Sequence, residues 1–447
     1  MTSVVWLRDD LRLADNPALR AASDRGQPVV VLYVLDVSGD SIRPLGGASR
    51  WWLHHSLAAL RDSLEAIGGA LTVRHGRPAD VVPAVIAETG ADAVFWNRRY
   101  TAAKDADAAL KTSLRDAGIE VQSFQAALLF EPWTVTTAEG NPYKVFTPFW
   151  KACLERGVAR APLDAPAGLD GLQLRSDELD LLPTRPDWAG GLRDSWTPGE
   201  AGAIANLEAF AAEGLADYHL RDQPGVEATS HLSPHLRFGE VSPFQVFHRI
   251  EHGTLSGAAR ANAAKFLSEV GWREFNANIL FHFPDLPTKN FRAEFDAFGW
   301  GSDYADDLTA WQQGRTGIPL VDAGMRELWH TGYMHNRVRM VTASFLIKNL
   351  LIDWRVGEQW FWDCLVDADE ASNAGNWQWV AGSGADAAPY FRVFNPVLQQ
   401  QKFDPHGDYV RRWVPEWGTP DYPEPIVDLK ASRAEALAAY EAVKAAR

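Results

Sequence analysis

Residues 3–36 read SVVWLRDDLRLADNPALRAASDRGQPVVVLYVLD, and this stretch decides the class of the fold. Two short runs of apolar, mostly β-branched residues, SVVWL (3–7) and VVVLYVLD (29–36), have the composition of buried strands. The helical pattern NPALRAASDRG (16–26) lies between them and ends at a glycine, as helix C-termini often do. A strand, a helix and a strand at this spacing predict a parallel sheet with helices on its faces.

The same alternation continues to about residue 125. Three further strand-like runs, LTVRH (71–75), AVFWN (93–97) and VQSFQ (121–125), are separated by helical segments. Ligands of such sheets usually bind beyond the carboxyl ends of the strands. Neither GxGxxG nor GxxxxGKS/T occurs, so the two common phosphate-binding fingerprints support neither a Rossmann dehydrogenase nor a P-loop enzyme.

The second half of the chain follows a different pattern. Residues from about 160 to 198 are rich in Pro, Gly, Asp and Leu without a sustained period, which is typical of a connector. From Gly199 onward the pattern is mainly helical. We therefore expect an α/β domain over residues 1–130, a connector over 131–198 and an all-helical domain over 199–447.

The composition fits a soluble globular protein, because 46% of the 447 residues are hydrophobic and 23% are charged. Cys153 and Cys364 alone allow no disulfide framework or zinc site, and they indicate a reducing compartment, which we take to be the cytoplasm. We see no signal peptide and no apolar run that could span a membrane. The net charge of -15 argues against non-specific coating of nucleic acid but leaves room for a local basic site.

Two segments carry groups that suit a phosphate-bearing or planar ligand. Thr229, Ser230 and Ser233 supply hydroxyl groups just before a helical pattern, where a phosphate can bind, although N-capping is the more common role. In LSEVGWREF (267–275), Glu269 and Trp272 share a helix face. This pair suits a polar, planar ligand, and the alternative is a half-buried Trp beside a solvated Glu.

The segment 334–354, MHNRVRMVTASFLIKNLLIDW, adds an Asn, an Arg and a Met on one helix face. Asn336, Arg339 and Met340 are three or four residues apart, whereas Arg337 is expected to point elsewhere. Asn hydrogen-bonds amide-like ring edges and Met gives a soft apolar contact. An ordinary amphipathic helix with Met in the core is the alternative.

The segment 365–396 places polar residues at a helical spacing of four. Asp369, Asn373 and Trp377 form one stripe if the segment is a helix, and Asp367 lies near its start. Because buried carboxylates need partners, Arg339 is a natural partner for one of the two aspartates. No serine-protease order of residues and no metal-ligand spacing is evident in the sequence.

Taken together, these stretches resemble the photolyase/cryptochrome family, and most of all its cyclobutane pyrimidine dimer photolyases. The similarity runs in the same order through nearly the whole chain, to about residue 417. The matching stretches are VVWLRDDLRLADNPAL (4–19), GNPYKVFTPFWKACL (140–154), ATSHLSPHLRFGEVSP (228–243), EVGWREF (269–275), GRTGIPLVDAGMRELWHTGYMHNRVRMVTASFLIKNLLIDWRVGE (314–358), DADEASNAGNWQWVAGSGADAAPYFRVFNP (367–396) and KFDPHGDYVRRWVPEW (402–417).

The resemblance implies a flavoprotein with FAD in the helical domain. By position, the residues that match phosphate contacts of the family are Tyr218, Thr229, Ser230 and Ser233. The residues that match other FAD contacts are Arg273, Arg339, Asp367 and Asp369. Asn373 matches the residue that faces the flavin N5, where photolyases carry Asn and plant blue-light receptors typically carry Asp.

The resemblance also implies a light-driven repair of DNA, in which excited FADH⁻ donates an electron to the dimer, the cyclobutane ring splits and the electron returns. Trp377, Trp354 and Trp300 match the chain that photoreduces FAD. The residues that match the pocket for the pyrimidine dimer are Glu269, Trp272, Asn336, Met340 and Trp379. Arg337 and Arg392 match contacts to the DNA backbone.

Alternatives remain open at this point. In (6-4) photolyases a catalytic His replaces Asn336, and a cryptochrome would signal instead of repairing, commonly with a long tail after the FAD domain. An unrelated α/β nucleotide-binding enzyme leaves the helical half unexplained, where eleven of the 19 Trp lie between Trp272 and Trp417. Ala103 and Lys104 replace the Asn-Glu pair of one folate-binding subgroup, so a deazaflavin antenna, another mode of binding methenyltetrahydrofolate, or no antenna all fit. We expect UV-damaged DNA as the partner, no membrane and a monomer.

Overall fold

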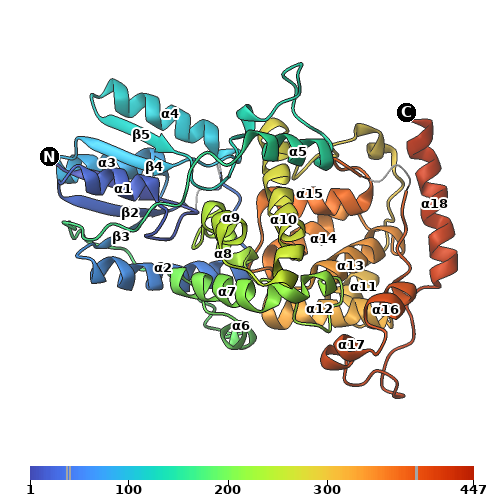
Figure 1. Cartoon of the computed structure of the whole chain (residues 1–447). Coiled ribbons are helices and arrows are strands. Elements are labelled where there is room, and N and C mark those ends of the chain that lie inside the picture. The colour runs from blue at the N-terminus through green and yellow to red at the C-terminus, as the bar shows by residue number, and fades with distance from the viewer. Residues whose placement is uncertain (37–38, 40–41, 388–390, 447) are drawn as a thin grey trace.

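The computed structural model describes residues 1–36, 39, 42–387 and 391–446, and its N-terminal part contains a five-stranded sheet (Figure 1). The strands are β1 Ser3–Leu7, β2 Val29–Leu35, β3 Leu71–His75, β4 Ala93–Asn97 and β5 Glu120–Phe124. They are arranged in the order β3-β2-β1-β4-β5, and every neighbouring pair is parallel. The predicted parallel sheet is therefore confirmed, with strand ends within one residue of those expected.

The helices of this part cover both faces of the sheet. Val5 and Val31 pack with α1 (Pro17–Asp24) and α2 (Gly47–Ala66) on one face. Val4 and Val30, one residue earlier on the same strands, pack with α3 (Pro78–Thr89) and α4 (Ala103–Asp116) on the other. Because successive strand side chains point to opposite faces, a strand covered on both faces must be apolar throughout, as these runs are.

The remaining helices form the second part of the molecule (Figure 1). Two of them, α5 (Phe146–Arg156) and α6 (Gly190–Ser195), lie within the predicted connector. The stretch 160–198 is therefore not entirely irregular. The other helices are α7 Glu200–Ala212, α8 Ser233–Arg237, α9 Pro243–His252, α10 Gly257–His282, α11 Ala305–Gln312, α12 Pro319–Thr331, α13 Asn336–Lys348, α14 Trp354–Cys364, α15 Glu370–Ala381, α16 Pro396–Phe403, α17 Asp408–Trp413 and α18 Leu429–Ala445, with 3-10 turns η1 Pro132–Thr134, η2 Gly214–Leu220 and η3 Ala293–Ala297.

Large aromatic side chains fill the helical core. Trp311, Trp354, Trp362 and Trp377 are buried in one cluster together with residues of α12 and α13. This confirms that filling a core is the role of several of the clustered tryptophans. Among the residues that the structure describes, no helix is both long and apolar enough to cross a membrane, and both cysteines are buried and unpaired.

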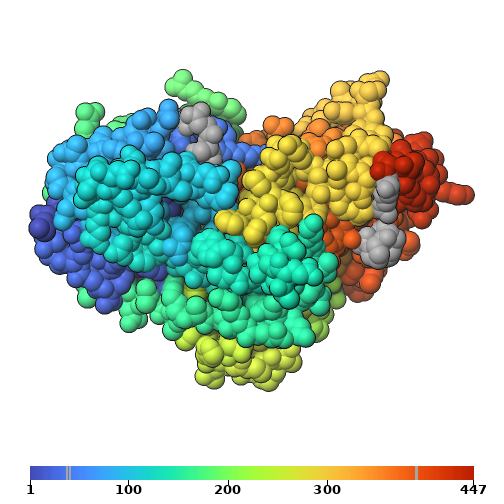
Figure 2. Space-filling model, turned by 90° about the horizontal axis from the view of Figure 1, so that it is seen from above, coloured from blue at the N-terminus to red at the C-terminus, as the bar shows by residue number. Residues whose placement is uncertain are grey.

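The two parts meet over an extended contact. Figure 2 shows them as two lobes, and residues of the predicted connector lie along both lobes. In the contact, the Trp52 indole of α2 donates a hydrogen bond to Glu240 at 3.0 Å, and Arg237 pairs with Asp9 at 2.7 Å. The predicted boundaries at residues 130 and 198 stay a prediction.

A buried carboxyl group at the centre of α10 makes the stability of the protein depend on pH. Glu274 accepts a hydrogen bond from the Phe130 amide at 3.1 Å and lies 3.4 Å from Arg273. Burial raises the pKa of Glu274 to about 7, although Arg273 acts in the opposite direction. Since the folded state then binds a proton more tightly than the unfolded state, this group lowers the free energy of unfolding as pH rises from its unfolded pKa to about 7.

We expect Glu274→Gln to remove this pH dependence. The difference in unfolding free energy between the wild type and the variant should fall as pH rises through this window and stay constant above it. Urea unfolding at a series of pH values measures the difference. A constant difference across the whole window would show that Glu274 does not titrate there.

Candidate functional site

An ion pair joins α13 to the segment that leads into α15. Arg339 donates to both carboxylate oxygens of Asp367, at 3.1 and 2.9 Å, and Ser233 donates to the same carboxylate at 2.7 Å. Burial acts against the charge of Arg339, but Asp367, with smaller contributions from Tyr333 and Glu327, offsets it, and the pKa of the guanidinium is raised. The expectation that Arg339 pairs with one of the two aspartates is confirmed, and the partner is Asp367.

The hydroxyl groups before α8 do not cap that helix. Its N-cap is Leu232, without a side-chain cap, and the Ser233 hydroxyl is directed to Asp367. Ser230 accepts a 3.4 Å hydrogen bond from the Leu232 amide, and Thr229 lies 3.3 Å from His231. N-capping, the common role of such residues, therefore does not explain why three hydroxyl groups gather here.

Tyr218 lies beside α10. It belongs to η2 and packs edge to face against Phe266, with ring centroids 5.4 Å apart. Burial raises the pKa of Tyr218, and the negative charge of Glu269 raises it further. The structure therefore brings Tyr218 and Glu269, two of the predicted site residues, close together.

Two side chains on the exposed side of α10 are held in different ways. Glu269 pairs with Lys265 one turn earlier, at 2.6 Å, and is 36% exposed. Trp272 is half-buried and stacks on Phe146, with ring centroids 4.0 Å apart and planes 8° from parallel. A stacked indole and an adjacent carboxylate form the apolar and polar sides of a surface that suits a planar, polar ligand.

The start of α13 corrects one expectation. Asn336 is exposed and Met340 is half-buried, on the face predicted for them. Arg337, however, does not point elsewhere, because its guanidinium lies 3.8 Å from the Met340 sulfur and 3.0 Å from Asp222. The spacing of three residues makes Arg337 a neighbour of Met340 on the helix surface.

The predicted stripe on α15 is confirmed. Asp369 is the N-cap of this helix and accepts from the Ser372 amide at 2.7 Å. Asn373, one turn later, is buried and donates from its amide nitrogen to Glu358 of α14. Trp377, a further turn on, is buried against Phe361, with ring centroids 4.9 Å apart.

The three tryptophans predicted as an electron-transfer chain differ in exposure. Trp377 and Trp354 are buried in the same cluster, and Trp354 donates to Asn290 at 3.0 Å. Trp300 is half-buried and packs on that cluster from outside. Two of the three are thus buried, and Trp300 lies nearer to the surface.

The last two predicted residues lie on either side of residues 388–390, which are outside the described part. Trp379 is half-buried and donates to the Asp386 carbonyl at 3.1 Å. The Arg392 carbonyl accepts from the buried Lys348 ammonium group, and the Arg392 guanidinium lies 5.8 Å from the Phe394 ring.

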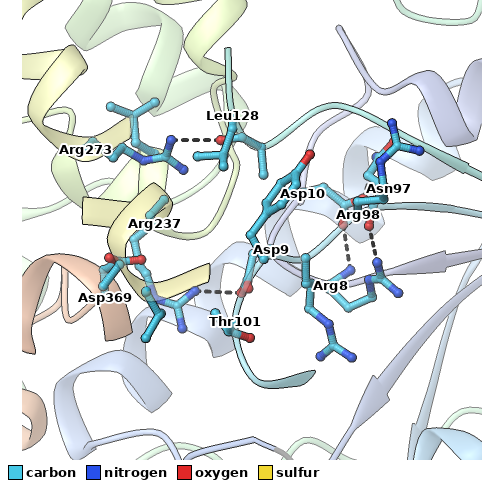
Figure 3. Close-up of a pocket in the computed structure, with 17 residues that line it drawn as sticks. Arg8, Asp9, Asp10, Asn97, Arg98, Thr101, Leu128, Arg237, Arg273 and Asp369 are labelled. Atoms are coloured by element: carbon cyan, nitrogen blue, oxygen red, sulfur yellow. Dashed lines mark hydrogen bonds and ion pairs between the residues drawn. The ribbon is translucent and has the colours of Figure 1, made fainter. Parts of the chain in front are cut away.

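A cavity of about 80 Å³ lies where the two parts of the molecule meet (Figure 3). It adjoins the carboxyl ends of β1 and β4, where the strand order of the sheet reverses. Arg273 and Asp369, both predicted FAD contacts, line it from the helical side, together with Arg237. Figure 3 shows Arg237 facing Asp9, and Arg273 reaching the backbone next to Leu128, where it donates to the Ala127 carbonyl at 2.8 Å.

The polar groups of the helical part fit FAD. Thr229 and Ser230, in the segment before α8, and Arg339 of α13 supply donors for phosphates, and the Ser233 hydroxyl at the start of α8 holds the Asp367 carboxylate beside them. Asn373 supplies an amide oxygen that has no hydrogen-bond partner among the described residues. The Glu358–Asn373 and Asp9–Arg237 contacts were not predicted from the sequence.

Comparisons with known proteins agree with this arrangement. A model of the DNA photolyase family matches residues 3–167, and one of the FAD binding domain of DNA photolyase matches residues 266–420. The chain is 51% identical to a deoxyribodipyrimidine photo-lyase of Agrobacterium fabrum, over 99% of this chain and 98% of that protein. It is 38% identical to Cryptochrome-1 of Arabidopsis thaliana, over 97% of this chain and 69% of that protein.

A solved structure gives the same result for the fold. A bacterial class III photolyase from Agrobacterium tumefaciens superposes with a TM-score of 0.94 at 50% sequence identity, and the match covers 99% of this chain and 98% of the other. The two-part fold and the extent of these matches leave one conclusion: the chain belongs to the photolyase/cryptochrome family.

Proposed function

We propose that the protein is a light-dependent DNA repair enzyme, a deoxyribodipyrimidine photo-lyase that splits cyclobutane pyrimidine dimers. The observation that carries this proposal is the state of Asn373. Both hydrogens of its amide are used by Glu358, so its oxygen is left to accept a hydrogen bond from the cofactor. An acceptor at this place favours the reduced flavin, which carries a proton on N5.

FAD binds in the helical part, and residues of several helices hold it. Thr229 and Ser230 donate from their hydroxyl groups to its phosphates, with Ser233 and Tyr218 beside them. Arg339 and Asp367, held together as an ion pair, fix the orientation of the cofactor. Arg273 and Asp369 complete the FAD contacts from the side of the cavity between the two parts.

The dimer binds against α10, α13 and α15. Trp272, held in place by its stack on Phe146, offers a flat surface for a base turned out of the duplex. Damaged bases stack poorly, so turning the dimer out costs less than turning out normal bases. Asn336, Met340 and Trp379 form the rest of the pocket, and Arg337 and Arg392 bind the DNA backbone, with an affinity that falls as salt rises.

The chemistry needs one electron from outside the dimer. FAD, when bound and reduced, would supply that electron under blue light and take it back after the C5–C5 and C6–C6 bonds of the cyclobutane ring break, so the reaction would involve no net redox change. As a carboxylic acid, Glu269 donates a hydrogen bond to the carbonyl side of the dimer, where negative charge develops. Trp377, Trp354 and Trp300 carry electrons inward from the surface to reduce FAD beforehand.

The protein acts as a monomer in the cytoplasm. A second, light-harvesting chromophore, a deazaflavin or methenyltetrahydrofolate, extends the range of light that drives repair. A (6-4) photolyase and a blue-light photoreceptor are the alternatives, and the repair assay distinguishes them from the proposal.

We expect the purified, reduced protein to restore intact thymines in an oligonucleotide with a thymine dimer under blue light and not in the dark. Glu269→Ala should slow repair at least about tenfold, which is less than the effect of removing a fully enclosed oxyanion donor because Glu269 is partly exposed. Glu155→Ala is the matched control, since Glu155 pairs with Lys151 at the same i,i+4 spacing away from the site. A protein that binds FAD but repairs no dimer under light would refute the proposed function.

A further inference from the structure

An arginine of the α/β part reaches a buried carboxylate next to Asn373. Arg43 lies in the segment before α2 and donates to both oxygens of Glu358 of α14, at 2.6 and 2.9 Å. The Glu358 side chain is 4% exposed and that of Arg43 is 24% exposed. Two parallel hydrogen bonds of this kind fix the plane of the carboxylate as well as its charge.

Glu358 in turn fixes the amide of Asn373. One of its carboxylate oxygens accepts from the Asn373 nitrogen at 2.8 Å, and its own backbone carbonyl accepts from the same nitrogen at 3.0 Å. A carboxylate and a carbonyl can only accept hydrogen bonds, so the atom that faces them must be the nitrogen of the amide. The oxygen of Asn373 therefore faces away from Glu358.

This orientation depends on where the Glu358 carboxylate lies. Two parallel hydrogen bonds from a planar guanidinium fix the position of a carboxylate that could otherwise rotate about its side-chain torsions. Arg43 therefore holds the Glu358 oxygen within reach of the Asn373 nitrogen. Arg43 also lies near Glu370 of α15. Burial and the charge of Asp369 raise the pKa of Glu370, and the charge of Arg43 acts in the opposite direction.

The segment that carries Arg43 is itself fastened to α14. The Pro44 carbonyl accepts from the Trp362 indole at 2.8 Å, and the Gly47 amide donates to Asp363 at 2.8 Å. The Arg43 guanidinium lies 4.1 Å from the centre of the Trp362 ring. At Gly46 the two backbones approach so closely that a Cβ atom would overlap the Trp362 carbonyl, so the contact requires glycine there.

We propose that Arg43, a residue of the α/β domain, is a positioning residue for the flavin: it holds the Glu358 carboxylate in place and so holds the Asn373 oxygen toward the flavin N5. This inference rests on the proposed function, because it takes FAD to be bound beside Asn373. It assigns the α/β domain a part in setting how readily the flavin is reduced, in addition to any role in light harvesting.

The test is the midpoint potential of the bound FAD, measured by spectroelectrochemistry on the holoprotein. In Arg43→Gln, the equilibrium constant for reduction should fall at least about tenfold, which for a two-electron couple is about 30 mV toward lower potential. Arg43→Lys keeps the charge but loses the paired geometry, so it should recover part of the shift. If Arg43→Gln does not fold, Arg43→Lys carries the test with a smaller shift in the same direction.

A double-mutant cycle separates the proposed relay from a direct effect of the arginine charge on the flavin. In a Glu358→Gln background there is no carboxylate for Arg43 to hold in place, so Arg43→Gln should cause no further shift. Ser49→Ala is the control, because it removes a 3.1 Å hydrogen bond to the Leu365 carbonyl in the same contact and leaves Arg43 in place. It should not change the potential.

Three results would overturn the inference. The first is an unchanged potential in both Arg43 variants, and the second is an equal shift with and without Glu358. If the wild type binds FAD and repairs dimers, either result refutes the role of Arg43 alone. The third is a wild type that binds no FAD, which would refute the proposed function and this inference together.

Discussion

Asp367→Ala is expected to destabilise the fold by about 3 kcal/mol and to release FAD, because it removes the only carboxylate that pairs with Arg339 in the described part of the chain. The Asp367 side chain is 5% exposed, and it receives hydrogen bonds from Arg339 and from Ser233. Without it, a largely buried guanidinium keeps its charge but loses its counter-charge. The Ser233 hydroxyl group, beside the residues proposed to bind the phosphates, loses its partner as well.

Two measurements check this result. Chemical denaturation gives the change in unfolding free energy, and the ratio of flavin to protein absorbance after gel filtration gives the FAD content. Glu208→Ala is the matched control, since Arg249 donates to both Glu208 oxygens at 2.9 Å but the carboxylate is 53% exposed. This control should lose less than about 1 kcal/mol. Full FAD content in Asp367→Ala would contradict the assignment of the ion pair to the cofactor site.

Trp377→Phe is expected to stop the photoreduction of FAD almost completely and to leave repair by the chemically reduced protein intact. Phenylalanine is much harder to oxidise than tryptophan, so it breaks the chain at its innermost member. The fold should survive the change, because a second aromatic ring fills most of the same space. The ring of Trp377 packs directly over Gly357, where any Cβ atom would overlap it.

Illumination of the oxidised holoprotein with an external electron donor measures photoreduction. The repair assay on pre-reduced protein measures dimer repair independently of photoreduction. Trp311→Phe is the control, since Trp311 lies in the same cluster with its ring centroid 6.4 Å from that of Trp377. It should remain photoreducible through Trp354. Loss of repair in pre-reduced Trp377→Phe would show that this residue serves the splitting reaction itself.

Much of the fold follows from local sequence patterns. The ends of β1 and β2 were predicted within one residue because a strand covered on both faces is largely apolar and stops where charged residues begin. The stripe of Asp369, Asn373 and Trp377 followed from the helical period alone. That Arg339 pairs with one of the two aspartates followed from the need of a buried carboxylate for a counter-charge, and the structure shows that the partner is Asp367.

Other features depend on contacts that no local pattern contains. Glu358 and Asn373 lie on different helices, and Asp9 and Arg237 lie in different parts of the chain. The side chain of Ser233 could have capped α8, and only the position of Asp367 shows that it does not. The predicted direction of Arg337 was wrong, because Arg337 and Met340 are three residues apart and therefore lie next to each other on the helix surface.

The contact between Arg43 and Glu358 has a consequence for protein engineering. The two halves of such proteins invite recombination, because the connector between them offers convenient crossover points. A chimera that takes the N-terminal half from one relative and the C-terminal half from another would inherit the arginine and the glutamate from different parents. Recombination libraries of these proteins should therefore treat positions 43 and 358 as one inherited unit, and variation of the N-terminal half becomes a way to adjust the flavin without mutating the pocket around it.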